Sequence, residues 1–191
     1  MPKKFDHSNS LRGQLLIATN ALDGSFFEKS VVYICAHDET GAMGVAINRA
    51  MGDVKCSDIL EQLSVEAEQI RFDASVYLGG PVDATRGFII HTSDYECDGT
   101  NPVRDNISVT GTVDILKDIA FGKGPGKSLV ALGYSGWSAG QLEKEIIENS
   151  WFSAPANEDL LFHMKNDEKW EATSKLIGVN FATISGQMGN A

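Results

Sequence analysis

Short apolar runs bounded by turn residues fill the first half of the chain, and this pattern predicts β-strands. We expect strands at 14–19, 30–38 and 42–48. The last two flank Glu39 to Gly41, whose residue types are typical of a hairpin turn. Neither strand of this hairpin alternates apolar with polar positions. Both faces of the predicted sheet should therefore be covered.

Further strands are expected at 75–78, 87–92, 107–109 and 129–132. Each is short and apolar, and the first of them ends at two glycines and a proline, which strongly interrupt regular structure. Segment 93–104 is acidic and rich in turn residues, so we expect a loop there.

Helical periodicity appears mainly in the second half of the chain. We expect helices capped by Ser57, by Thr112, by the capping box at 138–141 and by Asp167. The helix after the capping box should bury Leu142, Ile146 and Ile147, and the last helix should bury Trp170, Leu176 and Ile177. Because strand pairs come first and most helices follow, the order favours an α+β fold over a regular βαβ array.

The length of 191 residues suits one domain. We expect a flexible N-terminal segment at 1–10 and a single compact domain at 11–191. Hydrophobic residues make up 42% and charged residues 22% of the chain, which is ordinary globular usage and argues against disorder of the whole chain.

The charge balance argues against nucleic-acid binding. The chain has 16 basic and 26 acidic residues, a formal net charge of −10. Non-specific binding to nucleic acid depends on Lys and Arg that neutralise phosphates, and a chain this acidic repels DNA, RNA and anionic lipid at long range. Direct contact with nucleic acid or a membrane is therefore not expected.

The cysteines and the N-terminus indicate a cytoplasmic protein. Cys35, Cys56 and Cys97 are odd in number and widely spaced, which fits a reducing compartment better than a disulfide framework. No apolar segment of a secretory signal follows the N-terminal lysines, and the longest apolar stretch, 31–36, is too short to span a bilayer.

Two motifs come close to a ligand site without matching it. The glycine-rich segment 121–128 has Phe121 where a phosphate loop needs glycine, and a helix precedes it where a strand is required. Asp94, Glu96, Asp98 and Asp105 fall near the spacing of a calcium loop. Glu96 is long and Asp105 short for that role, so a solvated acidic loop is the better interpretation. We expect no metal and no cofactor.

Two candidate nucleophiles support an alternative, a small hydrolase or thiol enzyme. Cys35 and His37 are two apart on an expected strand, so their side chains should share a face. Ser135 follows Gly133 at the spacing of a nucleophile elbow, but Trp137 stands where the second glycine belongs. No third group to orient the Cys35–His37 pair is evident. We expect no catalytic residue.

A ligand site is the main hypothesis. Polar, aromatic and glycine residues gather at expected strand ends and turns: Asn48, Arg49, Gly79, Gly80, Arg86, His91 and Trp137. Turns that present backbone N–H groups near an arginine can hold an anion or a peptide. The alternative is that Arg49 and Arg86 form internal ion pairs in an acidic protein.

Long blocks of the chain resemble the AlgH/YqgE family of bacterial proteins. The blocks are 15–19, 27–37, 41–49, 77–82, 86–88, His91, 132–137, 140–143, Glu145, Asn149, Trp151, 160–162 and Trp170. The resemblance implies a mixed, barrel-like sheet surrounded by helices in a bacterial cytosolic protein. It implies no established catalytic residue.

The family carries the label of a proposed transcriptional regulator, which agrees poorly with a net charge of −10 and no helix-turn-helix pattern. We therefore expect a non-enzymatic regulatory or binding role that acts indirectly, through a protein or a small anionic or peptide ligand. The sequence does not define the oligomeric state.

Overall fold

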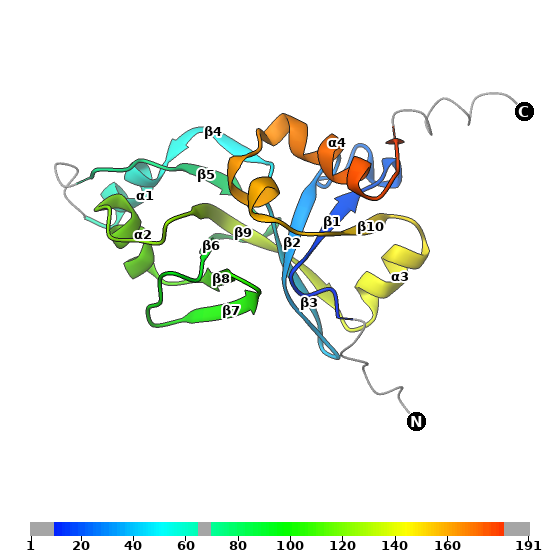
Figure 1. Cartoon of the computed structure of the whole chain (residues 1–191), viewed down its shortest axis with the longest axis horizontal. Coiled ribbons are helices and arrows are strands. Elements are labelled where there is room, and N and C mark those ends of the chain that lie inside the picture. The colour runs from blue at the N-terminus through cyan, green and yellow to red at the C-terminus, as the bar shows by residue number, and fades with distance from the viewer. Residues whose placement is uncertain (1–9, 65–69, 182–191) are drawn as a thin grey trace, which may run out of the picture.

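The computed structural model describes residues 10–64 and 70–181 (Figure 1). The strands are β1 (Gln14–Ala18), β2 (Val31–Asp38), β3 (Gly41–Ala46), β4 (Ala50–Lys55), β5 (Ser75–Leu78), β6 (Val82–Thr92), β7 (Thr100–Arg104), β8 (Ile107–Thr110), β9 (Ser128–Ser138) and β10 (Trp151–Pro155). The α-helices are α1 (Cys56–Gln62), α2 (Val113–Ala120), α3 (Gln141–Ile147) and α4 (Asn166–Leu176). A π-helical turn, Asp159–His163, leads into α4.

The strands form one curled sheet in the order β10-β1-β2-β3-β9-β6-β8-β7, and β5 joins β9 to β4 (Figure 1). Strand β5 runs parallel to β9, whereas the other paired strands are antiparallel. In Figure 1, α3 and α4 lie beside β1, β3 and β10, and α1 and α2 lie at the opposite end, beside β4 to β6. The expected α+β fold with a mixed, barrel-like sheet and surrounding helices is confirmed.

The hairpin of β2 and β3 is covered on both faces, as its apolar pattern predicts. Along β1 and β2, Leu15 and Tyr33 belong to one buried cluster, and Leu16 and Val32 belong to another on the opposite face. A third cluster lies between the sheet and helices α1 and α2. Burial on both faces explains why period-two alternation is absent from these strands.

Strand β9 connects the two halves of the sheet. Its first half pairs with β6 and β5, and its last residues pair with β3. Between them, Gly79 N–H donates to Leu132 O at 2.8 Å, and Gly79 O accepts from Ala46 N–H at 2.8 Å. A Cβ on Gly80 would lie 2.0 Å from the Tyr134 carbonyl carbon, so only glycine allows this backbone crossing.

Three strands were not expected from the sequence. They are β4, β10 and β7, and β7 lies inside the segment expected to be a loop. Strands β6 and β9 are also longer than expected, and Gly133 to Trp137 belongs to β9 and not to a tight turn. Both β4 and β7 lie at edges of the sheet, where each pairs with a single strand. Edge strands are commonly polar, and the sequences of these two carry few apolar residues.

All four expected helices are present, but several predicted details of their buried residues and of their caps were wrong. Ile147 is 80% exposed and Leu176 is 54% exposed, so neither helps to bury its helix. Helix α4 begins after Lys165, which makes Asp167 a first-turn residue and not the cap. In the capping box, Ser138 N–H and Oγ both donate to the Gln141 side chain, without the reciprocal bond.

We predict that Gly80→Ala lowers the free energy of unfolding by more than about 2 kcal/mol, because the added methyl overlaps the β9 backbone. Urea denaturation followed by circular dichroism measures this change. Gly87→Ala is the matched control, since nothing lies within 4 Å of its Cβ position. Equal stability of the two variants would contradict the close crossing.

Candidate functional site

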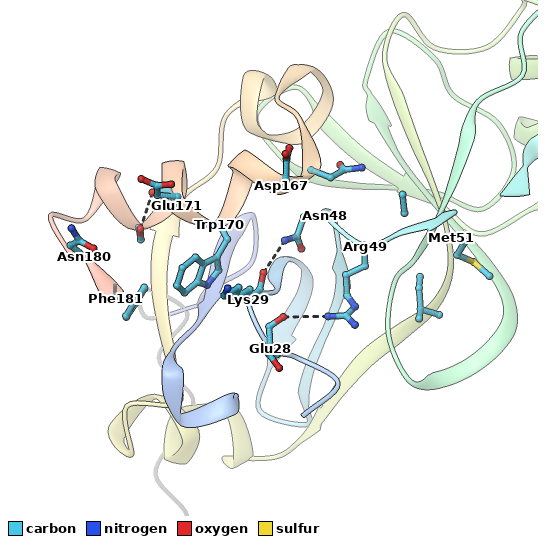
Figure 2. A pocket seen from close by; sticks show the side chains of 14 residues that line it. Glu28, Lys29, Asn48, Arg49, Met51, Asp167, Trp170, Glu171, Asn180 and Phe181 are labelled. Atoms are coloured by element: carbon cyan, nitrogen blue, oxygen red, sulfur yellow. Dashed lines mark hydrogen bonds between the residues drawn. The ribbon is translucent and has the colours of Figure 1, made fainter. Parts of the chain in front are cut away.

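A groove of about 930 Å³ lies open to solvent between α4 and the corner where β3 leads into β4 (Figure 2). Its walls come from the segment before β2, from the β3–β4 corner and from α4 together with the residues that follow this helix. The residues that line it are Glu28, Lys29, Asn48, Arg49, Ala50, Met51, Leu78, Asn166, Asp167, Trp170, Glu171, Ser174, Asn180 and Phe181.

Asn48 fixes the shape of the groove's floor. Its Oδ1 accepts from Val31 N–H and its Nδ2 donates to Lys29 O, both at 2.9 Å. This bridge ties the end of the β2–β3 hairpin to the entry of β2 and holds Lys29 in the left-handed region, at φ 52°. A non-glycine residue persists in this conformation only where its surroundings hold it there.

Arg49 lies at the side of the groove with part of its guanidinium engaged. Its Nη1 is 3.3 Å from both Glu28 O and Ser30 Oγ, and the guanidinium lies 4.8 Å over the Phe26 ring. Among the described residues Arg49 makes no ion pair. The alternative interpretation, an internal ion pair at Arg49, therefore has no support among the described residues.

Helix α4 is held against this corner by a buried lysine. Lys169 is 1% exposed, and its Nζ donates to Ile47 O at 2.8 Å and to Leu161 O at 3.2 Å. Its ammonium lies 5.6 Å over the Tyr77 ring and has no carboxylate partner among the described residues. Burial lowers the pKa of Lys169 to about 8.

The upper wall of the groove is aromatic. The Trp170 ring stacks on Phe181 at 5.3 Å between centroids, and its Nε1 donates to Ala18 O at 2.8 Å. The Lys29 ammonium lies 6.0 Å from the Trp170 ring centroid, at the outer limit for a cation–π contact. Figure 2 shows Lys29 beneath Trp170, with Asn48 and Arg49 beside it.

The seven residues expected to form a ligand site do not line one pocket. Asn48 and Arg49 line the groove, whereas Arg86 lines a second pocket beside β6. His91 is fully buried, and its Nδ1–H donates to Thr92 O at 2.9 Å while Nε2 accepts from Thr110 Oγ1 at 2.8 Å. Burial also lowers the pKa of His91, which favours the neutral imidazole that these two hydrogen bonds require.

The remaining expected site residues have structural roles. Trp137 is buried between β9 and α3, and its Nε1 donates to Glu145 Oε2 at 2.8 Å. Gly79 and Gly80 form the backbone crossing with β9 described above. All three were placed in a site by an expected turn. The backbone crossing accounts for Gly79 and Gly80, whereas Trp137 lies within β9 and not in a turn.

A β-bulge separates the expected thiol–imidazole pair. Ile34 pairs with Gly44 and Ala36 with Met43, so Cys35 is an extra residue in β2. Beyond it the faces exchange, and His37 pairs with Ala42 of the opposite buried cluster. The prediction that Cys35 and His37 share a face was therefore wrong.

Neither candidate nucleophile has an activating environment. Cys35 is 5% exposed, and burial raises the pKa of its thiol to about 12. His37 accepts from Leu11 N–H at 3.0 Å and contacts Glu143 Oε1 at 2.8 Å. Ser135 is fully buried within β9, and its Oγ donates to Gly79 O at 3.3 Å, so it does not sit at an exposed elbow.

The acidic loop and the glycine-rich loop contact each other. Asp94 accepts from Thr92 Oγ1 at 2.6 Å and from Gly126 N–H at 2.9 Å, so its carboxylate fixes the turn before β9. Within residues 10–64 and 70–181, no group of three or more His, Cys, Asp or Glu side chains could hold a metal ion.

None of the described helices combines the length and the apolar character needed to cross a bilayer.

The described residues thus form an α+β fold with one curled sheet, helices at its two ends and an open groove that carries both charge signs. The sequence profile of the AlgH-like family matches residues 15–182, and the chain belongs to this family. A UPF0301 protein of Rhizobium rhizogenes is 43% identical over 188 residues, covering 95% of this chain and 93% of that protein. A UPF0301 protein of Shewanella sp. strain ANA-3 is 41% identical over 186 residues, covering 95% and 99%.

Solved structures agree with this assignment. The solution structure of the AlgH protein from Pseudomonas aeruginosa superposes with a TM-score of 0.79 at 35% identity, covering 97% of this chain and 98% of that one. A crystal structure of a protein from Corynebacterium diphtheriae superposes with a TM-score of 0.67 at 20% identity, covering 86% of each chain, and shares the fold.

We predict that Lys169 makes stability depend on pH between about 8 and 10.5. Its pKa is lower in the folded than in the unfolded protein, so the unfolded chain binds more protons in this window. The unfolding free energy of the wild type should therefore rise by about 3 kcal/mol relative to Lys169→Met as pH increases through it. Urea denaturation at each pH measures the difference. Lys144→Met, at an exposed lysine of α3, should show no such slope.

We predict that iodoacetamide at about pH 8 alkylates Cys97 first in the native protein, because Cys97 is partly exposed. Cys35 and Cys56 are buried, and burial raises their pKa to about 12 and about 11, so they should react only after unfolding. Peptide mass spectrometry reads each site separately. Rapid labelling of Cys35 in the folded protein would revive the thiol-enzyme alternative.

Proposed function

We propose that this protein is a non-enzymatic binding protein that holds a peptide segment of a partner in the groove between α4 and the β3–β4 corner. The observation that carries the proposal is an open groove of about 930 Å³ whose walls bear both charge signs and an aromatic surface. A polypeptide offers backbone polar groups, charged side chains and apolar side chains together, which is the combination that such a wall recognises.

The charges of the groove are arranged on different elements. Lys29 and Arg49 come from the floor, and Asp167 and Glu171 come from α4. Glu171 already pairs with Lys175 at 2.7 Å, whereas Asp167 makes no ion pair with any described residue. The α4 wall therefore offers Asp167 to a cationic side chain, while Arg49 offers its remaining N–H groups to a carboxylate or carbonyl.

An edge strand adds a second means of holding an extended chain. Ala50 and Met51 of β4 line the groove, and β4 pairs with β5 alone among the described strands. Extended peptides commonly bind by adding to a sheet edge, where main-chain hydrogen bonds give affinity and neighbouring pockets give specificity. This supports a peptide over a compact metabolite as the occupant.

A regulatory role would then act through protein contact and not through DNA. The net charge of −10 disfavours phosphate contacts, and no cysteine or histidine lines the groove among the described residues. Three unpaired cysteines support a reducing, cytoplasmic location in the bacterial cell.

A displayed library of random 12-residue peptides, selected on the full chain, tests the proposal. We expect selected peptides to lose roughly three- to tenfold in affinity for Asp167→Asn and for Lys29→Asn, because each variant removes one groove charge. Asparagine tolerates the left-handed backbone at position 29, so the second variant keeps the local fold. Isothermal titration calorimetry measures the affinities.

Lys144→Gln on α3 is the matched control, because it removes a charge that is 73% exposed and lies outside the groove. Its affinity should equal that of the wild type. The proposal fails if the library yields no binder, or if selected peptides bind the groove variants and the wild type equally.

A further inference from the structure

A second pocket, of about 1020 Å³, lies on the other side of the hairpin, where β2 and β3 meet β6, β7 and β8. The proposed peptide groove does not use it. Three of its lining side chains are arginines from three separate segments: Arg12 before β1, Arg86 on β6 and Arg104 at the end of β7. The sequence hypothesis contained only Arg86, because the other two join it through the tertiary fold.

Each arginine is held in place by contacts that leave its charge unneutralised. Arg12 donates to Pro102 O, and the Arg86 guanidinium lies 5.2 Å over the Phe88 ring. Arg104 packs across Gly13, where an added Cβ would come within 2.5 Å of the Arg104 Cβ. These contacts orient the side chains, while most of their N–H donors remain available.

No described residue forms an ion pair with any of the three arginines. Among the described lining residues Asp38 alone carries a carboxylate, and it already accepts from Thr40 N–H at 2.8 Å and from Thr40 Oγ1 at 2.6 Å. In a chain with 26 acidic and 16 basic residues, a pocket with three unpaired arginines and one aspartate is a local reversal of charge.

Apolar side chains also line the pocket, beside polar ones such as Asn101 and Thr112. Met43, Phe88, Val103 and Val109 face the same pocket, and all four belong to or pack against the buried cluster that includes Cys35. Cys35 also lines it, and burial raises the pKa of its thiol to about 12, so it adds no negative charge. Arginines beside a group of apolar side chains are complementary to a molecule that is anionic at one end and apolar at the other.

We propose that this pocket binds a small organic anion that carries an apolar group beside a carboxylate or phosphate. Arg86 and Arg104 hold the anionic head through charge-assisted hydrogen bonds. Met43 and Phe88 contact the apolar part.

Two naphthalene dyes test the proposal in the full chain by fluorescence titration. The anionic probe is 8-anilinonaphthalene-1-sulfonate, and the neutral one is N-phenyl-1-naphthylamine, which lacks the sulfonate. We expect Arg86→Gln and Arg104→Gln each to weaken binding of the anionic dye roughly tenfold and to leave the neutral dye unchanged. Arg71→Gln is the matched control, since it removes an arginine that does not line the pocket, and should bind both dyes as the wild type does.

Competition separates the possible head groups. Decanoate or decyl phosphate should displace the anionic dye, and the more effective of the two identifies the preferred head, whereas decanol should displace it poorly. Equal affinity of the anionic dye for the wild type, Arg86→Gln and Arg104→Gln would overturn the proposal, as would displacement by decanol as strong as by decanoate. Binding of selected peptides to the groove should not change in either variant, so this proposal and the peptide proposal can fail separately.

Discussion

The backbone crossing of Gly79 and Gly80 over β9 is the constraint on which the arrangement of the sheet depends. Gly79 bonds to β9 through its N–H and to β3 through its carbonyl, so one residue joins the two halves. Gly80 allows the approach because a side chain there would overlap the β9 backbone. With this junction fixed, β3 ends where β4 begins beside β5, and the corner that carries Asn48 and Arg49 has a defined position.

The second constraint is the burial of Lys169, which positions α4 over that corner. A buried ammonium without a carboxylate is costly, and two carbonyl acceptors and an aromatic face offset only part of the cost. A methionine of similar volume would avoid the charge but would leave Ile47 O without this donor. Lys169 therefore positions α4, the helix that forms one wall of the groove, against the floor of the groove, and its buried charge lowers the stability of the folded protein.

The pattern of apolar residues predicted most of the fold, because the residues that form this pattern are the ones that the folded sheet buries. The runs of β1, β2 and β3 are apolar since both faces are covered, whereas β4 and β7 are polar edge strands that no apolar period marks. The spacing of Cys35 and His37 wrongly predicted that their side chains share a face of the sheet, because a single bulge at Cys35 exchanges the faces of β2 beyond it. Asn48 and Arg49 were identified from a turn, but Lys29, Trp170 and Arg104 join their sites only through tertiary contacts.

The net charge and the arginine pocket together restrict the size of an anion that this protein can hold. At physiological ionic strength the Debye length is about 8 Å, so carboxylates elsewhere on the surface are largely screened from a ligand inside the pocket. Arg86 and Arg104 act at contact distance, where a small anion meets positive charge. A polyanion such as DNA extends well beyond the pocket and meets the excess of acidic residues along its length. The proposed site for a compact anion is therefore compatible with an acidic chain for which we expect no contact with nucleic acid.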